Sequence, residues 1–490
     1  MADSQLAEPR EADPNLTAQV RSALKWVAGA RSAAQLVTWS ITLLVIRILS
    51  PEDYGLIAMA NVLIGLTNLL NELGLVPALI QVKEISEDLV KQVFGYILLS
   101  NLALFLAVFL VAPWFAWFFD NPALTALVRV LAFQLVIGSF GAVPMALLRR
   151  RLDFRGISLW SVMASLVGSG TSLILALRGF GVWALVAASL SIVSVETIGA
   201  LILARFWVRP QIGLEGMRRL FSFGAWISGS RIASYLGQSS DDLIVGKLLG
   251  DGPLGLYAVA RHVSTMPMQK VMSIFNHVAF PAFARLEGDL DQARSFFLKS
   301  ISLSCLVFFP VMWGLSAVGG DFTTVVLGEK WRDATLVLQI ITLTVPFQVV
   351  RYLLAPLMDA LGRPDVTFRN MVTSLTIIPL AVLLGSRWGI DGVAFSLAVA
   401  HPLALALMLR RSLALVDCRW QLLLEAAGRP AASAAIMYLA VRLASSLLNN
   451  HLEPAIRLAI TVAVGVVVFT IAALVVSRRE FSLLRRMLRT

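Results

Sequence analysis

The sequence predicts an all-α, polytopic membrane protein with about fourteen transmembrane helices. Of its 490 residues, 58% are apolar and only 14% are charged, whereas about a quarter of the residues in soluble domains are charged. Stretches of about 20 residues with few charges recur between residues 23 and 477, and this length lets a helix cross the hydrocarbon core of a bilayer. An internal repeat is the third observation, and it predicts two halves of like topology.

The repeat relates residues 26–60 to residues 226–260 without a gap, with 13 of 35 positions identical. The identical positions include the pairs Trp26 and Trp226, Arg31 and Arg231, and Gly55 and Gly255. The offset covers six predicted spans, an even number, so both halves begin on the same side of the membrane. The sequence therefore predicts two pseudo-symmetric, parallel six-helix bundles plus two C-terminal helices.

The predicted spans end where charged and turn residues interrupt the apolar stretches. In chain order they are 23–49, 54–80, 91–118, 123–148, 157–178, 181–204, 224–249, 255–284, 295–319, 334–360, 368–386, 391–409, 430–448 and 456–477. The corresponding organisation is a cytoplasmic tail at 1–22, an N-terminal bundle at 23–206, a cytoplasmic linker at 207–223, a C-terminal bundle at 224–410, a cytoplasmic loop with the last two spans at 411–477, and a basic cytoplasmic tail at 478–490.

Loop charges predict the orientation. With the N-terminus in the cytoplasm, the cytoplasmic loops and their flanks hold 27 of the 41 Lys and Arg residues. The opposite connections are mostly acidic or neutral, as at 50–54, 119–123 and 250–253. Because positive charge collects on the cytoplasmic side of membrane proteins, we expect both termini to be cytoplasmic.

Several function classes find no support in the residues. The net charge of +11 lies mainly in loops between spans, so we expect no nucleic-acid partner. The two cysteines form no disulfide framework, and no His, Cys or carboxylate spacing suggests a metal. No phosphate-binding loop or nucleophile motif occurs, so we expect neither an ATP-driven pump nor a bound cofactor.

Charged and polar residues inside the spans are the candidate site residues, because a charge at mid-bilayer costs about 2.5–3.5 kcal/mol on insertion scales. The candidate cations are Arg31, Arg47, Arg231, Lys247, Arg261, Lys270 and Arg351. The candidate ion-coupling or polar residues are Asn68, Glu72, Gln238, Asp241, Asp242, His262 and Asp359. At helical spacing, polar residues form stripes on spans 1, 2, 7 and 8, which we expect to face one cavity between the halves. The cations outnumber the anions, so an anionic ligand is expected.

Structural interpretations stay open for several of these residues. Arg47 and Lys247 lie near span ends, where a long side chain reaches the interface. Arg231 with Asp241 or Asp242 is equally suited to an ion pair that holds spans together. Arg31 and Arg231 have the strongest claim on a ligand, since the repeat places them at matching depth in both halves.

Four segments then identify a family resemblance: RILSPEDYGLIAMA, ELGLVPALIQ, RRRLDF and DDLIVGKLLGDGPLGLYAVAR. They resemble the polysaccharide transport family of lipid-linked oligosaccharide flippases, and in particular its exopolysaccharide branch. This family belongs to the multidrug/oligosaccharidyl-lipid/polysaccharide exporter superfamily, and the resemblance covers nearly the whole chain.

The resemblance implies a flippase in the bacterial inner membrane. Its substrate would be an undecaprenyl-diphosphate-linked oligosaccharide, moved by alternating access and coupled to a proton or sodium gradient. The carriers would be Glu72, Asp242 or Asp359, for each of which a structural role is equally open. Membrane lipids, a polysaccharide polymerase and a chain-length regulator are the other expected partners. Two alternatives remain, an ion-coupled small-molecule (multidrug) exporter on the same scaffold and a membrane glycosyltransferase or polymerase.

Overall fold

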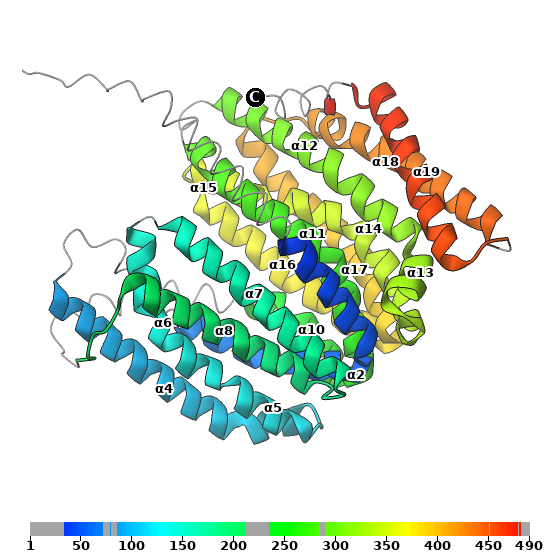
Figure 1. The fold of residues 1–490 in the computed structure, drawn as a ribbon. Coiled ribbons are helices and arrows are strands. Elements are labelled where there is room, and N and C mark those ends of the chain that lie inside the picture. Colours follow the sequence, from blue (N-terminus) through cyan, green and yellow to red (C-terminus); the bar gives the residue numbers. More distant parts are fainter. Residues whose placement is uncertain are drawn as a thin grey trace, which may run out of the picture.

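A computed structural model describes residues 34–71, 79, 86–151, 153–211, 235–284, 290–449, 451–478 and 480–481. Every regular element within these residues is helical, which confirms the predicted all-α, polytopic class. Figure 1 shows α4 to α8 grouped on one side of the molecule and α11 to α17 on the other, with α18 and α19 at the far edge of the second group.

The helices of the first half are Ala34–Ile48, α2 (Pro51–Asn71), α4 (Glu87–Phe118), α5 (Ala123–Leu131), α6 (Phe133–Arg150), α7 (Phe154–Leu177) and α8 (Trp183–Ala204). Those of the second half are α10 (Ser240–Leu249), α11 (Asp251–Ala284), α12 (Leu290–Ala317), α13 (Gly319–Phe322), η1 (Thr323–Leu327), η2 (Glu329–Ala334), α14 (Thr335–Tyr352), α15 (Leu354–Ala360), α16 (Pro364–Gly385), η3 (Ser386–Trp388) and α17 (Gly389–Leu415). The chain ends with α18 (Trp420–Leu448) and α19 (Pro454–Val475).

The helices of the structure can be compared with the predicted membrane crossings. Within the described residues, nine helical segments are long and apolar enough to cross a membrane. Helix Ala34–Ile48 and residues Pro51–Thr67 pass the same test only as a pair, bent by 118°. One of the nine segments, Pro364–Leu415, contains both α16 and α17, which pack against each other. The count of fourteen and the domain boundaries therefore stay predictions.

Short-range signals in the sequence place several helix ends. Ser86 caps α4, since its Oγ accepts a hydrogen bond from the backbone N–H of Leu89 at 3.2 Å. Asp153 caps α7 in the same way through the N–H of Gly156. Gly179 lies in the turn before α8 and Gly389 is the first residue of α17, with φ of +79° and +71°, a conformation that glycine adopts without strain. These two glycines begin the similar stretches GFGVWA and GIDGVA, so the halves turn alike at these points.

The two halves meet where α2 and α11 cross near their N-terminal ends. A Cβ atom on Gly55 would lie 1.9 Å from the carbonyl oxygen of Asp251, and one on Gly255 would lie 1.7 Å from that of Pro51. The backbones are therefore in contact, an approach that only glycine permits. We call this end of the molecule the outer end, because the predicted orientation places the connections at 50–54 and 250–253 outside the cytoplasm.

The largest group of buried apolar side chains surrounds this crossing. It includes Met59, Leu254, Tyr257 and Trp331, each with no more than 1% of its surface exposed. The Trp331 indole also donates a hydrogen bond to the carbonyl oxygen of Ile46 at 2.9 Å, from one half to the other. The halves are thus held together at the outer end by packing and by a buried hydrogen bond.

Candidate functional site

A cavity of about 1220 Å³ lies between the two halves. Helix Ala34–Ile48, α2, α7 and α8 line it from the first half, and residues before α10, α10 itself, α11 and α14 to α17 line it from the second. It extends from Tyr54, beside the glycine crossing, to Met408, near the C-terminal end of α17. A space of this size exceeds the usual 300–1000 Å³ of a small-molecule pocket.

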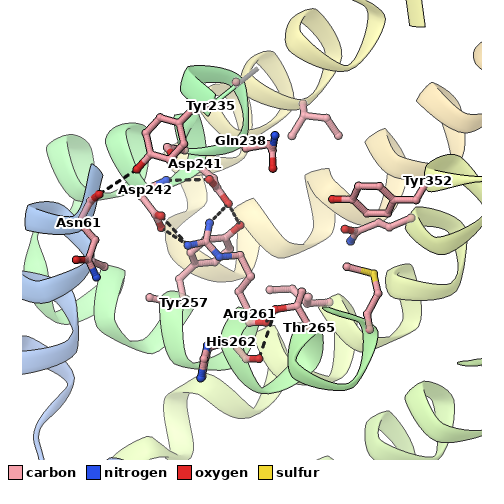
Figure 2. A pocket seen from close by; sticks show the side chains of 18 of the residues that line it. Asn61, Tyr235, Gln238, Asp241, Asp242, Tyr257, Arg261, His262, Thr265 and Tyr352 are labelled. Carbon is pink, nitrogen blue, oxygen red and sulfur yellow. Dashed lines mark hydrogen bonds and ion pairs between the residues drawn. The ribbon is translucent and has the colours of Figure 1, made fainter. Parts of the chain in front are cut away.

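The polar stripes of the first two and of the seventh and eighth predicted spans contribute to the wall. Residues of these stripes that line the cavity are Thr38, Thr42, Asn61, Gln238, Asp242, His262 and Thr265. Tyr235 joins the halves inside the cavity, since its hydroxyl donates to the carbonyl oxygen of Asn61 at 2.9 Å (Figure 2). Hydroxyl and amide groups therefore face the same space from both halves.

Four side chains of α10 and α11 form an Asp–Arg cluster, which we define as Asp241, Asp242, Tyr257 and Arg261. Figure 2 shows the Arg261 guanidinium between the two carboxylates. It donates to Asp241 and, through Nη2, to both oxygens of Asp242 at 2.7 and 2.6 Å. The Tyr257 hydroxyl donates to Asp241 Oδ2 at 2.7 Å. Both carboxylates are largely buried, with 12% of each side chain exposed, so they depend on this arginine for neutralisation.

Arg351 of α14 is the second arginine on the wall, and its surroundings differ. Its Nη1 donates to Ser374 Oγ on α16 at 3.0 Å, and the guanidinium carbon lies 5.6 Å from the centre of the Tyr352 ring. No carboxylate forms an ion pair with it in the described part of the chain. Gln348 and His401 line the same region, with Gln348 Nε2 3.4 Å from His401 Nε2.

Three of the predicted site residues do not line the cavity. Arg47 donates to the carbonyl oxygen of Val325 at 2.6 Å, and Lys247 lies 2.6 Å from Asp120 Oδ2. Asp359 accepts a hydrogen bond from the Thr367 hydroxyl at 2.7 Å. Of the predicted residues that the structure describes, those on the wall are Gln238, Asp241, Asp242, Arg261, His262 and Arg351.

The remaining predicted site residues lie outside the described residues. They are Arg31, Glu72 and Arg231, together with the side chains of Asn68 and Lys270. On the described wall, two arginines stand against two aspartates, so the numbers of cations and anions are equal there. The expected excess of cations depends on Arg31 and Arg231 and stays a prediction.

Sequence reasoning missed some polar wall residues of the second half. Gln348, Asn370 and Ser374 line the cavity from α14 and α16, but the search for stripes considered only the repeated spans. A usable signal was present, since Gln348 and Arg351 are three residues apart and Asn370 and Ser374 four apart, each pair on one helical face. Within the described residues, no group of three His, Cys, Asp or Glu side chains is arranged to hold a metal ion.

Comparison with known proteins gives one family match. The sequence model described as "Polysaccharide biosynthesis protein" matches residues 44–336, more than half of the chain. The lipopolysaccharide biosynthesis protein WzxC of Escherichia coli (strain K12) is 28% identical over 354 residues, which are 71% of each chain. The succinoglycan biosynthesis transport protein ExoT of Rhizobium meliloti (strain 1021) is 27% identical over 453 residues, 90% of this chain and 89% of ExoT.

The fold is also similar to that of a solved structure. The lipid II flippase MurJ in an inward closed conformation superimposes with a TM-score of 0.71 at 13% sequence identity, covering 92% of this chain and 99% of MurJ. At this low identity the likeness concerns the fold alone. The helices of this chain are therefore arranged as in a membrane protein of known structure.

Proposed function

The chain belongs to the polysaccharide biosynthesis protein family, and from that premise we propose that it flips an undecaprenyl-diphosphate-linked oligosaccharide across the bacterial inner membrane for exopolysaccharide synthesis. The observation that carries this proposal is the large cavity shared by both halves, with Arg261 and Arg351 on its wall. A charged and hydroxylated head group requires such a polar space inside the bilayer. The relatives named for lipopolysaccharide biosynthesis and succinoglycan transport support the substrate class.

The geometry suggests how the molecule would carry such a lipid. The glycine crossing closes the outer end, while the cavity extends toward Met408 on the predicted cytoplasmic side. The head group would enter the cavity from that side, with its polyprenyl tail left in the bilayer. Separation of α2 from α11 and closure of the opposite end would then expose the head group outside. Alternating access of this kind needs only rigid movement of one half against the other.

An ion gradient is part of the proposal. Of the candidate carriers that the structure describes, Asp242 and Asp241 are the best placed, because they line the cavity and contact Arg261. Asp359 lies off the wall, bonded to Thr367. A proton or a sodium ion would compete with Arg261 for these carboxylates. A polysaccharide polymerase and a chain-length regulator would act on the product, and both termini of the flippase would lie in the cytoplasm.

A multidrug exporter on the same scaffold is the second candidate. Arg351, which has no carboxylate ion pair in the described chain, and the many hydroxyl groups on the wall favour a polar anion over an apolar cation. A membrane glycosyltransferase or polymerase would need catalytic side chains in an extended loop. The longest connection predicted from the sequence, at 410–429, is short and basic and carries none of the motifs that such chemistry uses.

Reconstitution into liposomes tests the proposal. The substrate would be the lipid-linked oligosaccharide that accumulates in a strain lacking this gene, placed in one leaflet, with arrival in the other measured by a membrane-impermeant lectin. We expect the protein to accelerate transfer, and Arg129→Gln to transfer normally, since Arg129 packs over Phe109 away from the cavity. Transfer of a cationic dye alone would favour the multidrug exporter, and elongation of the glycan would favour the polymerase.

A further inference from the structure

The two arginines on the cavity wall have different capacity for a ligand. Arg261 already donates to three carboxylate oxygens of Asp241 and Asp242. A phosphate that approached Arg261 would also approach two carboxylates that already neutralise its charge, and displacing either one would leave it buried without a partner. Arg351 hydrogen-bonds to the neutral hydroxyls of Ser374 and Tyr352 and has no carboxylate ion pair in the described chain. Its positive charge is therefore available to an anion.

The groups around Arg351 are mostly hydrogen-bond donors. Gln348 lies one turn earlier on α14, Ser374 lies at the middle of α16, and His401 lies at the middle of α17. Ser374 Oγ accepts the hydrogen bond from Arg351, so its own hydrogen is free to point toward a ligand. Gln348 Nε2 lies 3.4 Å from both Thr344 Oγ1 and His401 Nε2. These contacts are at the long limit for a hydrogen bond, so the amide can turn its N–H groups toward a stronger acceptor. An anion at this point would meet donors from α14 and α16, with the His401 imidazole of α17 beside them.

Two buried polar atoms beside this group have no partner. His401 Nδ1 and Asn370 Oδ1 are inaccessible to solvent and form no hydrogen bond, although both residues line the cavity. More than about nine in ten buried polar atoms in proteins are hydrogen-bonded. The polar groups around Arg351 are thus not all satisfied by the protein, and this observation does not depend on the arginine. Of the two atoms only His401 Nδ1 can donate to an anion, because the Asn370 amide oxygen is an acceptor.

The described wall of the cavity is also divided by charge. Every charged side chain on its described wall belongs to the second half, from α10, α11 and α14. The first half presents hydroxyl and amide groups, among them Ser165, Ser169 and Ser189. Serine and threonine groups suit sugar hydroxyls, whereas a guanidinium suits phosphate oxygens, to which it binds with two parallel hydrogen bonds.

We propose that Arg351, Ser374, Gln348 and His401 form a subsite for the phosphate groups of the transported lipid, with the sugars lying against α7 and α8. This assignment rests on the proposed function and refines it. Arg261 is then the counter-ion of Asp241 and Asp242 and does not hold the phosphate in the described conformation. In this assignment the phosphate oxygens accept hydrogen bonds from side chains of the second half.

Binding to purified protein in lipid nanodiscs tests the assignment. The probes are undecaprenyl diphosphate, undecaprenol without phosphate, and inorganic pyrophosphate. Nanodiscs of phosphatidylcholine and of phosphatidylglycerol separate the probe from bulk anionic lipid. We expect Arg351→Gln to weaken binding of undecaprenyl diphosphate about tenfold or more, and to leave undecaprenol unchanged. Arg351→Lys should bind with intermediate affinity, and Ser374→Ala should weaken binding by less than Arg351→Gln.

The controls separate this subsite from the overall function. Arg129→Gln, which replaces an arginine away from the cavity, should bind like the unmodified protein. If Arg351→Gln does not fold, the Arg351→Lys and Ser374→Ala proteins decide, because both keep the packing.

Unchanged diphosphate affinity in these variants would overturn the subsite while leaving flipping intact. Absence of lipid transfer by the unmodified protein would instead overturn the proposed function. If inorganic pyrophosphate bound with the same affinity as undecaprenyl diphosphate, the subsite would take free phosphate. If phosphatidylglycerol competed with undecaprenyl diphosphate, the subsite would take any anionic lipid. Either result would overturn the assignment of the subsite to the transported lipid.

Discussion

Arg47 and Lys247 occupy the same position in the two repeats, and each binds a connection of the opposite half. Arg47 donates to the carbonyl oxygen of Val325 in the connection between α12 and α14, and Lys247 pairs with Asp120 in the connection between α4 and α5. These connections are themselves counterparts under the six-span offset. The two contacts lie at the outer end, beside the crossing of Gly55 with Gly255. The outer end is therefore closed by pseudo-symmetric contacts, and the repeated cations serve the closure rather than the cavity.

Removing both of these cations should favour opening of the outer end. The Lys247–Asp120 pair is exposed, with 37% and 74% of the two side chains accessible, and exposed pairs contribute about 0.2–1 kcal/mol each. We therefore expect Arg47→Ala with Lys247→Ala to label Asn61→Cys about twofold to tenfold faster with an impermeant thiol reagent added outside. The native cysteines, Cys305 and Cys418, are buried.

The matched control for the outer contacts is Arg363→Ala. Arg363 pairs with Asp365 at 2.9 Å on the surface, at the start of α16 and away from the outer end. It should leave the labelling rate of Asn61→Cys unchanged. Equal acceleration by this control, or none in the double variant, would contradict a role for the repeated cations in closure.

Enlarging a glycine at the crossing should prevent closure. A Cβ atom on Gly255 would lie 1.7 Å from the Pro51 carbonyl oxygen, so backbone would have to move. We expect Gly255→Val to lower the stability of the closed state by about 1–3 kcal/mol or more, and to abolish lipid transfer. Labelling of Asn61→Cys from outside should rise at the same time.

Gly170→Ala is the control for the crossing. Gly170 lies in α7, and a Cβ atom there would meet nothing within 4 Å. This variant should transfer lipid at the unmodified rate, since alanine also has the higher helix propensity. Normal transfer by Gly255→Val would show that the glycine crossing does not control the outer end.

Loss of Arg261 should destabilise the protein more than loss of Arg351. Arg261→Gln leaves two largely buried carboxylates without a counter-ion, which costs about 3–5 kcal/mol for a buried pair. Arg351→Gln leaves none of the described carboxylates unpaired, and we expect a loss of about 1 kcal/mol. Apparent melting temperatures in detergent measure the difference.

A compensating variant identifies the cause of that loss. Adding Asp241→Asn and Asp242→Asn to Arg261→Gln removes the unpaired charges and should recover most of the melting temperature. The same two changes on the unmodified arginine should be destabilising, because they leave a buried guanidinium alone. Failure of the triple variant to recover would mean that Arg261 stabilises the fold by packing and not by charge.

The buried Trp331 should contribute a measurable hydrogen bond between the halves. Its Nε1 donates to Ile46 at 2.9 Å, and none of its surface is exposed. Trp331→Phe keeps most of the packing and leaves the Ile46 carbonyl without its donor, at a cost of about 1–3 kcal/mol. Trp388→Phe is the comparison, because Trp388 is 73% exposed and its replacement should change the melting temperature little. Equal losses in both variants would argue against the inter-half hydrogen bond.

The sequence by itself determined the all-α membrane class, the duplication and the family. The length of an apolar stretch and the match between two repeats can both be read along the chain without knowing which segments pack together. It also indicated the wall residues Gln238, Asp242 and His262, since polar residues at helical spacing lie on one face of a helix. It could not show that Arg47 and Lys247 face the outer connections, because helical spacing does not say which neighbour covers a face.

Only the tertiary structure decided how the charges are paired. Arg261 lies 19 and 20 residues from Asp242 and Asp241, and they meet because the chain reverses between α10 and α11 at Gly250, whose φ is +90°. Within the described chain Arg351 has no carboxylate partner, because the helices beside it, α16 and α17, present Ser374 and His401 there. Charge pairing in a membrane cavity depends on which helices are neighbours, and that depends on packing between segments distant in the sequence.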